Sequence, residues 1–75
     1  MEVKVIGTNC KNGMQLFKMA SRAIEDNKAD IKLEKSDDIK DIKKYGVNNI
    51  PGLVIDDKLV SQGKVLTQKE ISKLL

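Results

Sequence analysis

The chemistry that this sequence could carry centres on Cys10, its one cysteine. Histidine is absent, so neither the common zinc ligand sets nor a histidine-based catalytic triad can be assembled within one chain. A lone cysteine also excludes an internal disulfide, which argues against a disulfide-stapled secreted fold and favours a reducing, cytoplasmic location. If the chain does chemistry, we expect the Cys10 thiol to do it, without a metal.

The position of Cys10 favours reactivity. Residues 2–6 form a short β-rich run that ends at the turn-forming residues 7–9, and apolar residues recur at helical spacing from Gly13 to about Asn27. Cys10 therefore lies just before a helix, where unpaired amides and the helix dipole stabilise an anion such as a thiolate, and the neighbouring Lys11 adds positive potential. The alternative is a small buried hydrophobic residue with no function.

Two further elements follow this predicted strand and helix. Residues 30–35 alternate apolar and charged side chains, which is typical of a strand with one buried face. Ser36 to Asp38 supply an N-cap, at Ser36, and two acids for the positive end of a short helix. Gly46 stands in the usual position after a helix end, with Val47 as its capping contact.

The residue pattern of the last third of the chain indicates a β-hairpin followed by a helix. Residues 53–55 form a continuous apolar run, the pair Asp56 and Asp57 makes a turn, and residues 59–60 return as the partner strand. The segment from Thr67 to Glu70 matches a capping box at the start of a helix. The predicted order is β-α-β-α-β-β-α, a four-stranded mixed sheet flanked by three helices.

Pro51 is the only proline and follows Ile50 just before the third predicted strand. It could simply mark the passage from loop to strand. Alternatively, the Ile50–Pro51 bond could be cis, which would turn the Ile50 backbone outward beside Cys10, ready to bind an extended peptide or a glutathione-like ligand. The sequence does not show which isomer is present.

Composition and charge limit the classes of partner. The chain has 40% hydrophobic and 33% charged residues, as expected of a folded globule, and no apolar run approaches the ~18 residues of a membrane span. Acidic residues are mixed with the lysines, so the net charge of +3 indicates solubility. A lysine-mediated nucleic-acid binder is the weakest hypothesis, since Phe17 and Tyr45 are the only aromatic residues.

Three segments give the chain a resemblance to the thioredoxin and glutaredoxin superfamily, in particular to its small redox-active disulfide proteins of bacteria and archaea. They are Gly7-Thr-Asn-Cys10, Gly46-Val-Asn-Asn-Ile-Pro-Gly-Leu-Val-Ile55 and Lys58-Leu-Val-Ser-Gln-Gly63. The resemblance spans the chain and implies one thioredoxin-like α/β domain over residues 1–75.

The resemblance also implies roles for individual residues. Cys10 corresponds to the attacking thiol, Ile50 and Pro51 to the substrate platform with its cis-proline, and Gly63 to the glycine that lets a ligand approach. Residues 11–13 complete the motif and are expected to contact the substrate, namely Lys11, Asn12 and Gly13.

One departure from the superfamily pattern is important. The family has Cys-x-x-Cys, whereas this sequence has Cys10-Lys-Asn-Gly13, so the resolving thiol is missing. Glycine in a first helical turn costs up to about 1 kcal/mol relative to alanine, so helix stability does not explain it. The protein has evolved a one-thiol mechanism, it has lost the redox role, or a natural cysteine was replaced.

Two functions from different classes follow. The first is a monothiol disulfide oxidoreductase in which Cys10 forms a mixed disulfide that an external thiol resolves, with no cofactor and with glutathione as co-substrate. Monothiol glutaredoxins also hold an iron–sulfur cluster between two subunits, which this chain could attempt only as a dimer. The second is a non-catalytic module that binds an extended peptide at Ile50 and Pro51.

The expected partners are a disulfide-bearing protein or a low-molecular-weight thiol, with no membrane and no specific nucleic acid. We expect a monomer. A dimer linked through Cys10 could form under oxidation.

Overall fold

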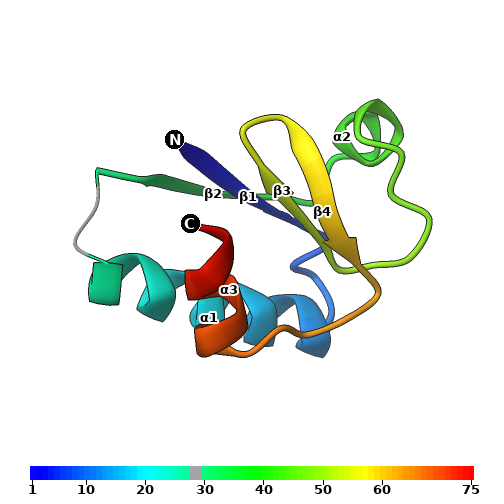
Figure 1. The fold of residues 1–75 in the computed structure, drawn as a ribbon. Helices are drawn as coiled ribbons and strands as arrows, with labels where there is room; N and C mark the ends of the chain where they lie inside the picture. Colours follow the sequence, from blue (N-terminus) through cyan, green and yellow to red (C-terminus); the bar gives the residue numbers. More distant parts are fainter. Residues whose placement is uncertain (28–29) are drawn as a thin grey trace.

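The computed structural model describes residues 1–27 and 30–75. Its elements occur in the predicted order (Figure 1): β1 (Glu2–Ile6), α1 (Lys11–Asn27), β2 (Lys32–Ser36), α2 (Ile39–Lys44), β3 (Gly52–Ile55), β4 (Lys58–Gln62) and α3 (Gln68–Leu74). The strand predicted over residues 30–35 is shifted toward the C-terminus. Its pairing with β1 begins at Glu2 and Lys32, so Asp30 and Ile31 precede the paired strand.

The four strands form one mixed sheet in the order β2-β1-β3-β4. β1 pairs with β2 in parallel and with β3 antiparallel, and β4 forms an antiparallel hairpin with β3. The hairpin turns at Asp56 and Asp57, both with positive φ (50° and 66°), as the primed turns of two-residue hairpins require. The predicted four-stranded mixed sheet flanked by three helices is confirmed.

Helices α1 and α3 cover one face of the sheet, which we call the α1/α3 face (Figure 1). Alternate residues of β1 and β3 point toward these two helices, because successive strand side chains lie on opposite faces. The buried core on this face consists of Val3, Val5, Leu16, Ala20, Ala23, Leu53, Ile55 and Ile71. All of these side chains are apolar, so the core of this face is held together by packing.

The opposite face, which we call the α2 face, carries the short helix α2 and a smaller apolar cluster (Figure 1). Its buried members are Ile6, Val47 and Val54. Gly46 has φ 69°, its amide donates to the Lys43 carbonyl, and the Val47 amide donates to the Ile42 carbonyl at 2.9 Å. These two bonds form a Schellman motif, so the predicted C-terminal signal of this helix is confirmed.

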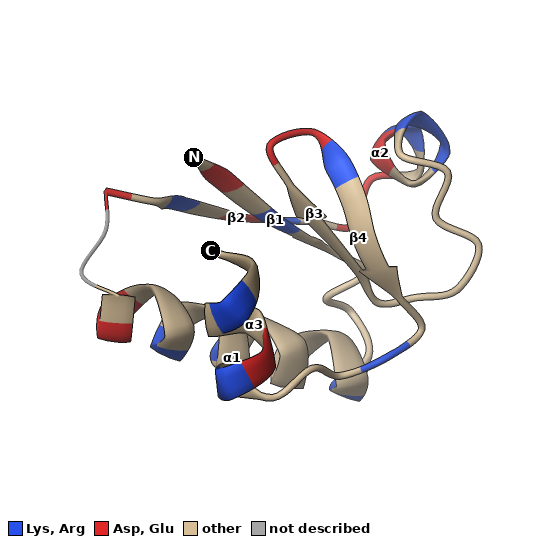
Figure 2. Ribbon diagram, viewed as in Figure 1, with Lys and Arg blue, Asp and Glu red and all other residues tan. Residues whose placement is uncertain are grey.

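The N-terminal cap of α2 differs from the prediction. Asp38 is the N-cap, and its side chain accepts a hydrogen bond from the Lys40 amide at 2.9 Å. Ser36 was the wrong residue, because it pairs with Ile6 as the last residue of β2 and keeps an extended backbone. Acidic residues lie at the start of α2 and basic residues at its end (Figure 2), as the helix dipole favours.

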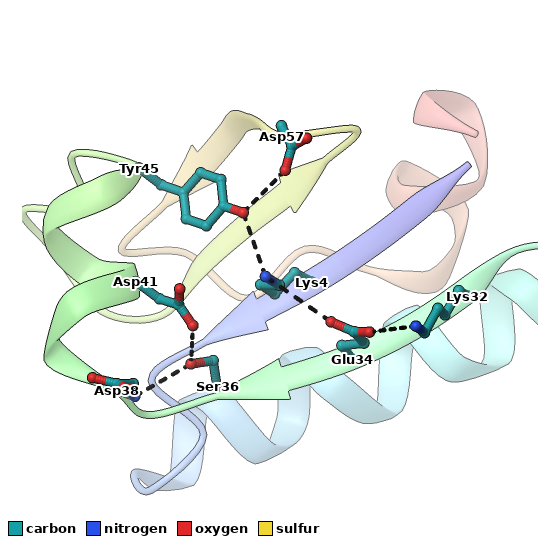
Figure 3. Close-up of polar contacts among 8 residues, drawn as sticks. All are labelled: Lys4, Lys32, Glu34, Ser36, Asp38, Asp41, Tyr45 and Asp57. Atoms are coloured by element: carbon teal, nitrogen blue, oxygen red, sulfur yellow. Dashed lines mark hydrogen bonds and ion pairs between the residues drawn. The ribbon is translucent and has the colours of Figure 1, made fainter.

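A polar cluster covers the α2 face beside this helix (Figure 3), and we call it the Lys4 cluster. The Lys4 ammonium donates to the Tyr45 hydroxyl at 3.4 Å, and that hydroxyl donates to Asp57 at 3.0 Å. The bond to Tyr45 raises the pKa of Lys4 above its ordinary 10.5. Glu34 lies 4.0 Å from Lys4 and 2.9 Å from Lys32, and its hydrogen bond with Lys32 lowers the pKa of the Glu34 carboxyl.

The predicted capping box at the start of α3 is confirmed. The Thr67 side chain accepts from the Glu70 amide, and the Glu70 carboxylate accepts from the Thr67 amide, each at 3.2 Å. The cap fixes the start of α3, the helix that carries Ile71 into the core of the α1/α3 face.

Among the helices of residues 1–27 and 30–75, none combines the length and the apolar character that a membrane span needs.

Candidate functional site around Cys10

The loop between β1 and α1 is held in place by the end of β2 and the residue after it. The Gly7 amide donates to the Ser36 carbonyl at 2.8 Å. The Thr8 hydroxyl and the Asn9 amide each donate to one oxygen of the Asp37 carboxylate, both at 2.9 Å. Thr8 is buried, so the loop lies against the protein. Asp37 therefore fixes the backbone that leads into Cys10.

Cys10 is exposed and directly precedes the first residue of α1. Its sulfur has two hydrogen-bond partners. The thiol donates to the Gly7 carbonyl at 3.3 Å, and the Gly13 amide donates to Sγ at 3.3 Å. The first bond requires the protonated thiol, whereas the second stabilises the thiolate. Lys11 and Asn12 form the first turn of the helix with exposed side chains, so the thiol is open to solvent beside them.

Gly13 packs against the main chain of the same loop. A Cβ atom built on Gly13 would lie 2.0 Å from the Gly7 carbonyl oxygen and 2.8 Å from Thr8 Cα. Side-chain rotation cannot relieve either contact, since both involve backbone atoms. In this structure, the space that a side chain at position 13 would need is taken by the loop.

Ile50 and Pro51 lie on the other side of Gly7. The Ile50–Pro51 peptide bond is cis, which answers the question of isomer that the sequence left open. The Pro51 side chain is fully buried, whereas Ile50 is 48% exposed, so Ile50 supplies the accessible surface of the pair. A Cβ atom on Gly7, which has φ 89°, would lie 2.0 Å from Ile50 Cγ2. Gly7 therefore contacts both the thiol of Cys10 and the side chain of Ile50.

Gly63 and its neighbour hold the loop before Pro51. The Gly63 amide donates to the Pro51 carbonyl at 2.9 Å. The Gln62 side-chain oxygen accepts from the amides of Asn48 and Asn49, at 2.7 and 3.2 Å. Gly63 also packs so closely on Asn49 that a Cβ atom would lie 2.9 Å from the Asn49 Cβ. The structure thus links Gly63 to Pro51.

The structure joins the predicted site residues into two adjoining groups that meet at Gly7. Cys10 and Gly13 form one group, and Ile50, Pro51 and Gly63 form the other. Sequence reasoning missed the anchoring roles of Asp37 and Gln62, and it treated Gly7 only as a turn former. The run Gly7-Thr-Asn is a turn signal, but nothing in the sequence indicates which distant side chains bind it.

In the described parts of the chain, no three histidine, cysteine, aspartate or glutamate side chains lie together as a metal ion would require.

The whole chain, residues 1–75, matches the thioredoxin domain family. The chain belongs to this family. It is 33% identical over 75 residues to a thioredoxin of Methanothermobacter thermautotrophicus, covering all of this chain and 97% of the relative. It is 29% identical over 73 residues to a thioredoxin of Methanocaldococcus jannaschii, covering 97% of this chain and 84% of the relative. No solved structure matched the chain at a significant level.

This thioredoxin-family domain has the α/β architecture that the sequence predicted, and its family is confirmed along with the fold. The candidate thiol lies where β1 leads into α1, and Ile50 and Pro51 lie just before β3. β1 and β3 are neighbours in the sheet, and Ile6 at the end of β1 lies opposite Gly52 at the start of β3. The two loops therefore lie at the same end of these strands.

Proposed function

We propose that this protein is a thiol–disulfide oxidoreductase that works through one thiol, Cys10, with the adduct resolved by an external thiol such as glutathione. The thioredoxin domain match and the two archaeal thioredoxins support a thioredoxin-like redox function. The one-thiol mechanism is our own step beyond that support. It needs no cofactor in the protein.

The proposed cycle has two exchange steps. The Cys10 thiolate attacks one sulfur of a disulfide, a new bond forms between Cys10 and that sulfur, and the other sulfur leaves as a thiolate. An external thiolate then attacks the substrate sulfur of this mixed disulfide, and Cys10 leaves as a thiolate. One half of the substrate is released as a thiol and the other ends in a mixed disulfide with the external thiol, from which a second external thiol can release it. The Gly13 amide, which donates to Sγ, stabilises the Cys10 thiolate at both ends of the cycle.

The observation that carries the proposal is the contact at Gly13. In a two-cysteine mechanism, the side chain at position 13 would supply the resolving thiol. Here a Cβ atom at that position would lie 2.0 Å from the Gly7 carbonyl oxygen, so the packed backbone opposes any side chain there. An exposed thiol combined with a closed position 13 favours resolution from outside the chain.

The surface around Ile50 is our candidate for holding the disulfide substrate. Ile50 is 48% exposed, and no backbone hydrogen bond of Ile50 occurs within residues 1–27 and 30–75. Its N–H and C=O groups are therefore available to an extended chain. We propose disulfide-bearing proteins and low-molecular-weight thiols as partners, and a cytoplasmic monomer as the working form. Lys11 and Asn12 flank the thiol and would meet the same substrate.

The experiment is a single-turnover exchange followed by a rescue. Native protein is mixed with bis(2-hydroxyethyl) disulfide, the adduct is followed by intact mass, and glutathione is then added. We expect one adduct on Cys10, formed faster in native protein than in urea-unfolded protein, and removed by glutathione. Cys10→Ser is the matched control and should form no adduct. Equal or faster reaction of the unfolded chain would contradict the proposal.

The exposure of Ile50, together with the lack of a hydrogen bond to its backbone among the described residues, also supports a second candidate, a non-catalytic module that binds an extended peptide. The two candidates differ in their need for the thiol. Pull-down of a peptide by Cys10→Ser protein as strong as by the native protein, without any adduct in the exchange assay, would select the binding module.

A further inference from the structure

A pocket of about 230 Å³ opens between α1 and β2, against the residue that precedes Cys10. It is lined by Asn9, which precedes Cys10, and by Met14, which follows one turn later on the same face of the helix. The lining is completed by Thr8, by Phe17 and Lys18 of α1, by Lys35 of β2 and by Asp37. Cys10, Ile50 and Gly63 do not line it, so the pocket is separate from the proposed platform and adjoins the thiol only through Asn9, the residue next to Cys10.

The lining combines an apolar wall with positive charge. Met14 is 56% exposed, and Phe17, three residues later in the helix, is half-buried. The Lys35 ammonium lies over the Phe17 ring, 5.8 Å from its centroid. This arrangement brings the Lys35 charge over the pocket wall, since a cation is attracted to an aromatic face.

The charges of the pocket do not cancel one another. Within residues 1–27 and 30–75, neither Lys18 nor Lys35 forms an ion pair. The acid in the lining, Asp37, already accepts one hydrogen bond at each carboxylate oxygen, from Thr8 and Asn9. Two lysines against one carboxylate leave a net positive lining, which begins at Asn9, the residue before Cys10.

We propose that this pocket is a subsite for a carboxylate attached close to the reacting sulfur of the disulfide substrate. The proposal rests on the proposed function and names its substrate class: disulfides that carry an acidic group on a short apolar arm. The arm lies along Met14 and Phe17, and the carboxylate pairs with Lys18 and Lys35. The exchange step is unchanged, with the substrate S–S bond broken, the bond to Cys10 formed and one substrate thiolate released.

The test compares three disulfides with the same two-carbon arm and different end groups. They are 3,3′-dithiodipropionate (carboxylate), bis(2-hydroxyethyl) disulfide (neutral) and cystamine (ammonium). The rate of Cys10 adduct formation is measured for each by intact mass in native protein and in the double variant Lys18→Gln and Lys35→Gln. We expect the double variant to lose about three- to tenfold in rate with the carboxylate compound, since partly exposed charge contacts are weak. The rate with the neutral compound should not change, and the rate with cystamine should rise.

The matched control is the double variant Lys58→Gln and Lys69→Gln, which lowers the net charge of +3 by the same two units. Lys58 begins β4 opposite Ile55, at the end of the sheet away from Cys10, and Lys69 lies on α3. This control should leave all three rates near those of the native protein. An equal loss in both double variants would overturn the subsite, because it would show an effect of overall charge alone.

A peptide arm of the same experiment identifies the source of the carboxylate. Mixed disulfides of short peptides, with aspartate or serine next to the cysteine, replace the small compounds. A preference for the aspartate peptide that Lys18→Gln and Lys35→Gln removes supports an acidic segment of a protein substrate. A preference confined to the small compounds supports a small acidic disulfide instead.

Rates that do not depend on the end group, with Cys10 still reactive, would overturn the inference and leave the proposed function intact. No adduct with any compound would contradict the proposed function itself.

Discussion

On the α1/α3 face, alternate residues of β1 and β3 enter a core of apolar side chains, whereas on the α2 face the same strands present Ile6 and Val54 next to Lys4. The first face is closed by two helices and the second by one helix of six residues. On the second face, the apolar cluster is small, and the polar side chains of the Lys4 cluster and of the start of α2 occupy the surface beside it (Figure 3). A chain of 75 residues thus concentrates its apolar burial on one face.

The largest effect should separate the two faces directly. Leu16 is fully buried on the α1/α3 face. Leu16→Ala should lower the unfolding free energy of the protein by about 2–5 kcal/mol, because the substitution leaves a cavity. Leu59→Ala on the α2 face should lose about 1 kcal/mol, because a half-exposed side chain has less apolar area to lose. Urea unfolding of both variants measures the difference. Equal losses would show that the two faces contribute alike.

A second comparison uses one glycine from the site and one from the α2 face. Gly13→Ala should lose about 1–3 kcal/mol of unfolding free energy and slow the reaction of Cys10, because the new Cβ pushes the Gly7 loop away. Gly46→Ala meets no atom within 4 Å but keeps a positive φ, so it should lose about 1–2 kcal/mol and leave the thiol reaction unchanged. Unfolding and alkylation rates are measured together. Unchanged alkylation in Gly13→Ala would contradict the contact.

The Lys4 cluster should contribute less than either core. Tyr45→Phe removes the hydroxyl that accepts from Lys4 and donates to Asp57, which should lower the unfolding free energy by about 0.5–1.5 kcal/mol. Urea unfolding near neutral pH measures the loss, and Tyr45→Leu, which also removes the ring, should lose more. A neutral or stabilising effect of Tyr45→Phe would mean that helix α2 is held by its apolar contacts and caps alone.

The smallest effect concerns pH. The pKa of Glu34 is lowered in the folded protein by its hydrogen bond and charge interaction with Lys32, so the charged form stabilises the fold. This stabilisation is present above the ordinary value of 4.5 and is lost as the pH falls through the lower folded-state pKa. Thermal unfolding from pH 7 to pH 3 should therefore show a steeper loss in the native protein than in Glu34→Gln. Parallel curves would rule out this contribution.

The sequence predicted the order of elements because periodic apolar residues and caps are local signals. The capping box at Thr67 and the helix end at Gly46 were both read from neighbouring residues. The N-cap of α2 was misplaced because Ser36 and Asp38 are both good caps, and the choice depends on where β2 stops pairing. Local patterns cannot give that tertiary register.

The candidate site was only partly accessible to the same reasoning. Cys10 could be found from its residue type and its place before a helix. The contact of Gly13 with Gly7, and the anchoring of the loop by Asp37, join backbone or side chains across the fold. Neither has a sequence signature. The pocket at Lys18 and Lys35 likewise depends on α1 and β2 lying together, which only the packed structure shows.

The contact between Gly13 and the loop has a consequence for how this lineage can change. A codon change that introduced a cysteine at position 13 would meet the Gly7 carbonyl before it could supply a thiol. The loop could move aside only by disturbing its bonds to Ser36 and Asp37. A cysteine at position 13 would therefore need at least one further substitution in that loop, to give its side chain room.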